Sequence, residues 1–163
     1  MTVIGLIADT HGFLDPSIAD HFKDCDQIWH LGDIGDESIL DKLKIDRAVY
    51  GNIDSKEIQW KLPENEIIEL EGLRFLLTHI AGKPPRYNKR VRTLIEEIKP
   101  DVLICGHSHQ ETVKKDRENG IVFLNPGAAG KQGFHKYRHI MKIEVENKKI
   151  TNLELIKLGK KSV

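Results

Sequence analysis

Short apolar runs alternate with polar stretches along the whole chain. In the first two thirds they predict strands at residues 2–8, 27–31, 46–50, 74–78 and 102–105. Each run is continuous and does not alternate with polar residues, which is typical of strands that are covered on both faces. Helical periodicity predicts helices between these strands, at residues 16–23, 36–43 and 87–98.

The last third of the chain has a different pattern. Strand-like segments at residues 111–116, 121–124, 138–144 and 149–158 follow one another, with turn signals at residues 118–120 and 146–148. The chain therefore opens as βα units and closes as β-hairpins, which predicts an α/β fold with two packed sheets and helices outside them. Because no repeat or linker interrupts the pattern, we expect one domain at residues 1–158 and a short polar tail at residues 159–163.

Side chains that can bind a metal follow each of the five early strands. They are Asp9, His11, Asp33, Asn52, His79, His107 and His109. In open α/β sheets, the carboxyl ends of the strands border one crevice. We therefore expect these side chains, which lie far apart in the sequence, to converge on one site.

Two pairs of these residues have a spacing that suits a shared cluster. Asp9 and His11 are two positions apart, and so are His107 and His109. While the chain stays extended, residues two apart point to the same side, so each pair can present two ligands together. We also expect a sharp turn out of the strand at three glycines that precede ligands: Gly32, Gly51 and Gly106.

The donor set consists of carboxylate, imidazole and amide groups and contains no thiolate. Such a set is too large for one tetrahedral zinc ion, but it suits two metals about 3.5–4 Å apart that share a carboxylate. Nitrogen and oxygen donors of this kind accept Mn, Fe, Zn, Co or Ni without selecting one of them. We therefore predict two divalent ions, with Mn²⁺ as the first expectation.

The order of these motifs resembles the signature of the calcineurin-like metallophosphoesterases. The motifs are Asp9-Thr10-His11, Gly32-Asp33, Gly51-Asn52-Ile53-Asp54, His79 and Gly106-His107-Ser108-His109. The small size, the Asn125-Pro126-Gly127 segment and the closing hairpins look closest to the compact bacterial and archaeal phosphodiesterase branch. Ordered motifs across residues 2 to about 158 make the resemblance specific, where any one of them would be weak evidence.

The resemblance implies a four-layer αββα sandwich with two mixed β-sheets flanked by helices. It also implies one metal held by Asp9, His11 and His109, a second held by Asn52, His79 and His107, and Asp33 as the bridge between them. A hydroxide shared by the metals would attack phosphorus, and both metals would stabilise charge on the phosphoryl oxygens. The expected function is metal-dependent hydrolysis of phosphate esters, with a phosphodiester as the expected substrate.

One position departs from the family pattern. Many relatives have a histidine near the leaving group where this chain has Ile53, and isoleucine cannot donate a proton. The candidates for that role are Asp54 and His135, and the latter lies in a glycine-rich segment that is either a phosphate contact or a flexible hairpin connection. The predicted catalytic set is therefore Asp33, Asn52, Asp54 and His135.

Charge and composition narrow the function classes. The chain has 25 Lys and Arg against 25 Asp and Glu, and this zero net charge argues against a protein that coats nucleic acid. Two cysteines outside any C-x-x-C pair, and a start without a basic region, predict a cytoplasmic protein with no signal peptide. We expect a small phosphate ester or nucleotide as substrate, no stable binding of nucleic acid and no membrane association, and we leave homodimer formation open.

Two other functions stay open at the sequence level. One is a non-enzymatic metal-binding scaffold of the same fold, such as the relative found in the eukaryotic retromer complex, because fold does not determine function. The complete ligand set favours an enzyme, since a scaffold has no need of it. The other is a nuclease for short oligonucleotides, although 6% aromatic residues supply no obvious strand-binding surface.

Two further groups have structural interpretations that we favour. The basic residues Lys83, Arg86, Lys89, Arg90 and Arg92 form either a solvated helix face, the commoner case, or a contact for phosphates beyond the scissile one. His30 lies inside an apolar run, and we expect a packed strand histidine there rather than a ligand.

Overall fold

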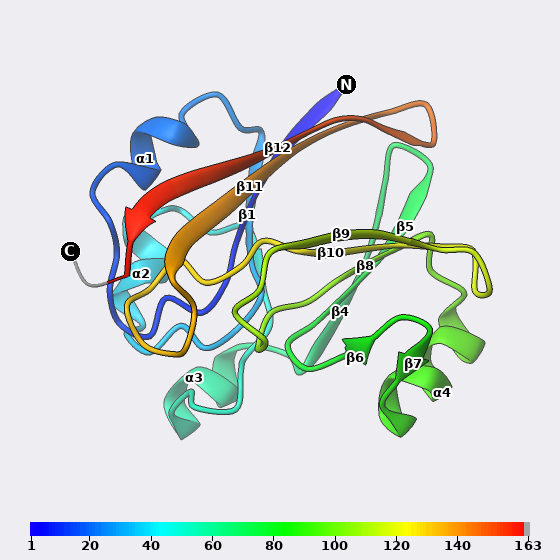
Figure 1. Ribbon diagram of the computed structural model, residues 1–163, viewed down its shortest axis with the longest axis horizontal. Coiled ribbons are helices and arrows are strands. Elements are labelled where there is room, and N and C mark those ends of the chain that lie inside the picture. Colours follow the sequence, from blue (N-terminus) through cyan, green and yellow to red (C-terminus); the bar gives the residue numbers. More distant parts are fainter. Residues whose placement is uncertain (162–163) are drawn as a thin grey trace.

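Two five-stranded mixed sheets lie face to face at the centre of the computed structural model, which describes residues 1–161 (Figure 1). The first sheet has the order β12 (Lys149–Lys160), β11 (Tyr137–Glu146), β1 (Thr2–Ile7), β2 (Gln27–His30) and β3 (Arg47–Ala48). Its strands β1, β2 and β3 are parallel, and β11 is antiparallel to both of its neighbours. The carboxyl ends of the three parallel strands therefore lie at one edge.

The second sheet has the order β4 (Asn65–Leu70), β5 (Leu73–Thr78), β8 (Val102–Ile104), β10 (Ile121–Asn125) and β9 (Thr112–Asp116). Strands β5, β8 and β10 are parallel, and the two edge strands are antiparallel to their neighbours. A separate two-stranded hairpin of β6 (Gly82–Lys83) and β7 (Arg86–Tyr87) follows β5.

Three hydrophobic clusters hold the layers together. The central cluster joins side chains of both sheets, with Trp29 of the first against Phe75 of the second at a ring-centroid distance of 5.1 Å. Helices α1 (Ile18–His21), α2 (Ser38–Lys42) and α3 (Lys56–Lys61) cover the outer face of the first sheet, and α4 (Lys89–Ile98) covers the second. The αββα sandwich implied by the resemblance is therefore confirmed.

Several elements differ from the sequence predictions. The helix α3, the edge strand β4 and the β6–β7 hairpin were not predicted, and α1 is shorter than residues 16–23. The strand β12 continues to Lys160, so part of the predicted tail at residues 159–163 belongs to a sheet, and residues 162–163 lie outside the described residues. None of the described helices has the length and apolar character needed to cross a membrane.

Candidate metal centre

The predicted ligands follow the carboxyl ends of parallel strands in both sheets. Asp9 and His11 follow β1, Asp33 follows β2, Asn52 follows β3, His79 follows β5, and His107 and His109 follow β8. Because the two sheets pack face to face, these loops meet at one edge of the sandwich. The convergence expected from the sequence is what the structure shows.

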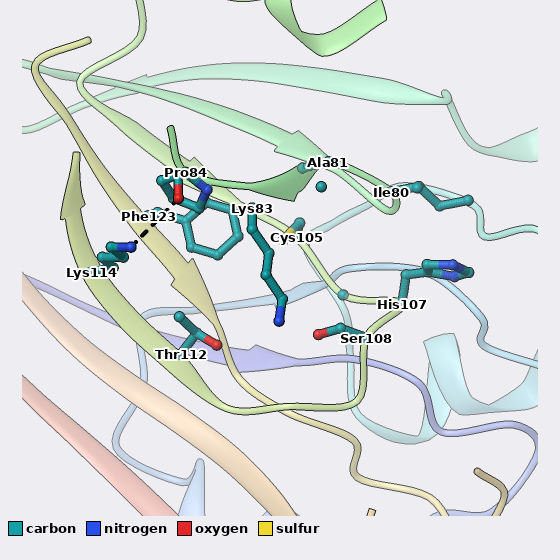
Figure 2. A pocket seen from close by; sticks show the side chains of 12 residues that line it. Ile80, Ala81, Lys83, Pro84, Cys105, His107, Ser108, Thr112, Lys114 and Phe123 are labelled. Carbon is teal, nitrogen blue, oxygen red and sulfur yellow. Dashed lines mark hydrogen bonds between the residues drawn. The ribbon is translucent and has the colours of Figure 1, made fainter. Parts of the chain in front are cut away.

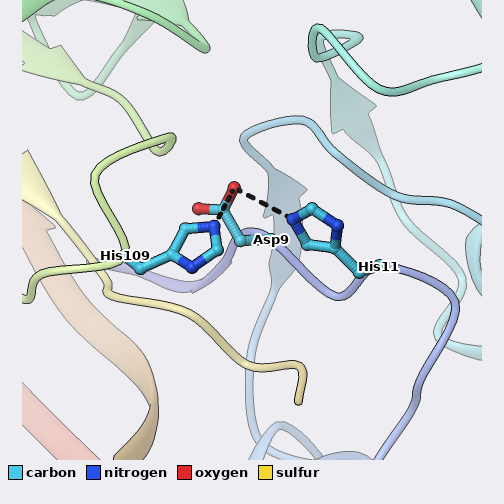
Figure 3. Close-up of side chains that lie close together, drawn as sticks. All are labelled: Asp9, His11 and His109. Carbon is cyan, nitrogen blue, oxygen red and sulfur yellow. Dashed lines mark ion pairs between the residues drawn. The ribbon is translucent and has the colours of Figure 1, made fainter. Parts of the chain in front are cut away.

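One group of donors consists of Asp9, His11 and His109, whose ligand atoms all lie within 4.8 Å of one another (Figure 3). Asp9 Oδ1 is 3.9 Å from His11 Nε2 and 3.4 Å from His109 Nε2. The carboxylate lies between the two imidazoles, which come from opposite sheets. One oxygen and two nitrogens therefore face a common point.

A second group of donors consists of Asp33, His79 and His107. Asp33 Oδ2 is 3.1 Å from His79 Nε2 and also 3.5 Å from His11 Nε2 of the first group. Asn52 Oδ1 lies 3.1 Å from His107 Nδ1. Asp33 therefore lies between the two groups, which is the place of a bridging carboxylate, and Asn52 adjoins the second group.

The ligand pairs do not arise from an extended backbone, contrary to the sequence argument. Asp9 and His11 have φ angles of 53° and 47°, and His107 and His109 have 70° and 63°. These are left-handed conformations, so the chain turns at each ligand. Asp9 and His11 still share one group, but His107 and His109 belong to different groups.

The glycines before the ligands also act in a way that the sequence did not predict. Gly32 has a φ of 100° and makes the expected turn. Gly106 has no positive φ, but a Cβ there would lie 2.9 Å from Asp9 Oδ2, and a Cβ at Gly51 would collide with Asp33. These two glycines are needed because a ligand carboxylate packs directly against the backbone.

Three polar atoms in the centre are buried without a hydrogen-bond partner among the described residues: Asp9 Oδ1, His11 Nε2 and His79 Nε2. A buried polar atom without a partner costs free energy, so such atoms are rare outside functional sites. Here the three atoms face one another, with His79 Nε2 3.8 Å from Asp9 Oδ1. Divalent cations at the two donor groups would satisfy all of them, and the donor set therefore fits the metals that the sequence predicts.

Hydrogen bonds to the remaining atoms orient the ligands. His79 Nδ1 donates to the Leu31 carbonyl at 2.7 Å, because a carbonyl can only accept, and this leaves the Nε2 lone pair directed at the centre. The His107 amide donates to Asp9 Oδ2 at 3.0 Å, and the Ile53 amide donates to Asp33 Oδ1 at 3.0 Å. Each of these carboxylates thus uses one oxygen for the backbone and presents the other to the centre.

Opposite charges face one another in the centre and shift its pKa values. Burial lowers the pKa of His79, but the Asp33 and Asp9 carboxylates outweigh burial and raise it above the ordinary histidine value. Burial likewise raises the pKa of Asp33, and the neighbouring His79 ring, 3.1 Å from its carboxylate, outweighs burial and lowers the pKa. The carboxylates therefore favour a positive charge at the centre, which a cation site requires.

The two proton-donor candidates are both engaged in hydrogen bonds. Asp54 is 4% exposed, and its oxygens accept from the Gly35 amide at 2.9 Å and the Gly51 amide at 2.7 Å. These hydrogen bonds hold the loop that carries Asn52, and proton donation by Asp54 stays a prediction. Ile53 itself is 46% exposed.

His135 contacts His109, one of the predicted ligands, and lines a pocket with it. Its Nε2 donates to the Gly130 carbonyl at 2.8 Å, and its Nδ1 lies 3.2 Å from His109 Nδ1. Both ring nitrogens are therefore occupied. This geometry suits a residue that positions His109 better than one that protonates a leaving group.

Two positioning residues received no role from the sequence. His30 is fully buried, and its Nδ1 accepts from the Gly32 amide at 3.1 Å while its Nε2 contacts Thr10 Oγ1 at 3.1 Å. Burial lowers the pKa of His30 to about 3, so the ring is neutral, as a packed strand histidine should be. Asn125 donates from Nδ2 to the Gly106 carbonyl and to Ser108 Oγ. Asn125 could have been predicted from the sequence as a positioning residue, because it is a polar residue at the end of an apolar strand.

A model of the calcineurin-like phosphoesterase superfamily domain matches residues 1–148 of the chain. The chain belongs to this superfamily. A probable metallophosphoesterase of Methanocaldococcus jannaschii is 36% identical over 155 residues, covering 90% of this chain and 77% of that protein. One from Methanothermobacter thermautotrophicus is 32% identical over 134 residues, covering 77% of this chain and 76% of its own length. The family and the donor groups together identify a metal-dependent phosphoesterase.

Solved structures show the same fold at lower sequence identity. A novel archaeal phosphodiesterase superimposes with a TM-score of 0.75 at 22% identity, covering 96% of this chain and 99% of that chain. Vps29 from Entamoeba histolytica, in a crystal structure with Zn²⁺, gives a TM-score of 0.72 at 19% identity, covering 96% of this chain and 98% of that chain.

Proposed function

We propose that the protein is a phosphodiesterase that works with two divalent metal ions, of which Mn²⁺ is the first expectation. The observation that carries this proposal is the pair of donor groups with Asp33 between them. Two metals that share a carboxylate are the arrangement used for displacement at phosphorus. The archaeal phosphodiesterase of the same fold supports a diester as the substrate.

The residues of the chain have separate tasks in this proposal. Asp9, His11 and His109 would hold one ion, Asn52, His79 and His107 the other, and Asp33 both. When bound, the ions supply Lewis-acid activation of water and of the phosphoryl group. The hydrogen bonds to Leu31, Ile53 and the His107 amide fix the ligand atoms beforehand, so little reorganisation accompanies the reaction.

The test is hydrolysis of bis(p-nitrophenyl) phosphate before chelation, after chelation and after Mn²⁺ is added back. We choose this ester because its leaving group departs as an anion and needs no donor at Ile53. Activity should disappear with chelation and return with Mn²⁺. Asp33→Asn and His107→Ala should each lower kcat/KM by on the order of 100-fold or more, since each removes a ligand.

His21→Ala is the matched control, because His21 lies in α1 and belongs to neither donor group. It should retain wild-type activity. A protein that binds Mn²⁺ but shows no turnover of any ester would contradict the proposal and favour the scaffold interpretation. Retained activity in Asp33→Asn would contradict the two-metal arrangement.

A further inference from the structure

A pocket of about 350 Å³ borders the metal centre along Gly106, His107 and Ser108 (Figure 2). It lies between this loop, the β6–β7 hairpin and the strands β9 and β10. The hairpin is the segment after His79 that the sequence did not predict. A volume of this size is at the lower end of the range for small-molecule sites, which begins at roughly 300 Å³.

The wall of the pocket is largely apolar. Ile80, Ala81, Pro84, Cys105 and Phe123 line it, and Phe123 is only 3% exposed because it packs at the back. Ile80, which is 37% exposed, presents the most accessible of these apolar side chains to a ligand, with Phe123 and Pro84 buried behind the surface. Binding a strongly hydrated ligand against such a wall costs free energy, whereas burying an aromatic group there is favourable.

The polar groups of the pocket favour an anion. Lys83 and Lys114 line it, together with the hydroxyls of Ser108 and Thr112, and no acidic residue is among the described residues that line it. Lys114 Nζ donates to the Pro84 carbonyl at 3.4 Å. Lys83 forms no ion pair within residues 1–161, and its ammonium extends toward Ser108 and Thr112 in Figure 2.

The basic residues between Lys83 and Arg92, which we call the basic run, have different surroundings in the structure. Arg90 is bound by Asn65, Thr78 and the Ile80 carbonyl, so it supports the loop after His79. Lys89 begins α4 and is exposed, outside the lining of the pocket. Lys83 lines the pocket described above, whereas Arg90 lines a different pocket that borders the metal centre at Asn52 and His79.

We propose that this pocket binds the organic part of the substrate, an aromatic or heteroaromatic group that carries a second anionic substituent, with Lys83 as the contact for that anion. The proposal rests on the proposed function, since the scissile phosphate would lie at the donor groups beside His107. A nucleoside with phosphates at both ends has this chemistry. Ile80 would contact the ring, with Phe123 and Pro84 behind it, and the hydroxyls of Ser108 and Thr112 would help bind the anion.

The first test measures binding to the chelator-treated protein, with naphthalene-1-sulfonate as a probe that contains an aromatic ring and an anion but no phosphorus. We expect saturable amide shifts in nuclear magnetic resonance spectra, concentrated at Ser108, Thr112 and Phe123. Lys83→Met should weaken binding by about tenfold, the loss expected for one charge-assisted hydrogen bond. Lys89→Met, the matched exposed lysine, should leave the affinity unchanged.

The second test compares the metal-loaded protein on two esters, thymidine 5′-(p-nitrophenyl phosphate) with and without a 3′-phosphate. We divide kcat/KM for the ester with the 3′-phosphate by kcat/KM for the ester without it. This ratio should fall by about tenfold in Lys83→Met and stay unchanged in Lys89→Met. Equal probe affinity in wild type and Lys83→Met, or shifts spread over the whole surface, would overturn the pocket assignment. Probe binding in a protein that hydrolyses no ester would instead overturn the proposed function and leave the pocket as an aromatic-anion site.

Discussion

Most of the predicted ligands have a left-handed backbone. Asp9, His11, Asp33, His107 and His109 have φ angles between 47° and 70°. For residues other than glycine this conformation costs roughly 1–2 kcal/mol each, although aspartate and histidine tolerate it better than most. Backbone hydrogen bonds hold the strained residues, as from the Asp9 amide to the Gly32 carbonyl at 3.0 Å. Strain concentrated at ligand positions is typical of a functional site.

The contact between His135 and His109 predicts an effect on metal affinity. A carbonyl partner requires that His135 Nε2 carry the hydrogen, so neutral His135 accepts at Nδ1 from His109 and leaves His109 Nε2 free for a metal. His135→Leu should therefore weaken Mn²⁺ binding by roughly 10–100-fold, the usual effect of losing such a partner. Isothermal titration calorimetry on the chelator-treated protein measures the dissociation constant directly.

His135→Asn separates positioning from packing, because its amide oxygen can still accept from His109. We expect it to restore much of the lost affinity. Phe134→Ala, the neighbouring side chain that is fully exposed, is the control and should bind Mn²⁺ like the wild type. Equal affinity in His135→Leu and the wild type would leave His135 without a positioning role.

At the scale of elements, continuous apolar runs predicted the strands that bury both faces, and turn signals helped to predict the edge strands β9 and β12, but the edge strand β4 was missed. All of Leu103, Ile104 and Val102 in β8 are buried, and this strand was predicted. In β4 only Ile68 is buried and Ile67 is 51% exposed, so this edge strand has no continuous apolar run. The strands β6 and β7 have two residues each, too few for any period to show.

The beginning of α4 predicts a loss of stability on mutation. Asn88 is the N-cap, and its side-chain oxygen accepts from the Val91 amide at 2.9 Å while Nδ2 donates to the Ile80 carbonyl at 3.0 Å. Asn88→Ala should lower the free energy of unfolding by about 1 kcal/mol. Urea denaturation followed by circular dichroism gives this value.

Asn88→Asp keeps the helix cap but loses the hydrogen bond to the Ile80 carbonyl. It therefore separates the contribution of the cap to stability from the contribution of that bond. We expect it to retain most of the wild-type stability, because aspartate caps helices as well as asparagine. If Asn88→Asp is as unstable as Asn88→Ala, the bond to Ile80 and not the cap holds this segment, and the prediction is wrong.

At the scale of the whole molecule, the membership of the site followed from the order of the elements, whereas its division into two groups was expected only from the resemblance to a known family. Membership follows from the rule for the carboxyl ends of parallel strands, which needs only the order of the elements. The division depends on how the second sheet faces the first. His107 and His109 are neighbours in sequence but turn toward Asp33 and Asp9, which follow different strands of the opposite sheet.

An ion pair far apart in sequence ties the segment after the first ligands to the closing hairpin. Arg138 Nη1 of β11 donates to Asp15 Oδ2, and Arg138 Nε donates to the Lys160 carbonyl of β12 at 3.2 Å. Burial raises the pKa of Asp15, but hydrogen bonds from Arg138 and from the Ser17 amide and hydroxyl outweigh it and lower the pKa below the ordinary value. Folding therefore favours the ionised carboxylate.

This lowered pKa predicts a pH-dependent difference between the wild type and Asp15→Asn, which resembles the protonated carboxyl. A depressed pKa contributes stability that is complete above the ordinary carboxyl pKa of about 3.9 and is lost as the pH falls through the folded-state value. The wild type should exceed Asp15→Asn by about 1 kcal/mol at neutral pH, and the two should converge as the pH falls through the lowered folded-state pKa of Asp15. Urea denaturation across this pH range measures the difference, with Asp20→Asn as the control, since the Asp20 side chain is 80% exposed. A difference that stays constant from neutral to acid pH would show that the Asp15 charge does not contribute through Arg138.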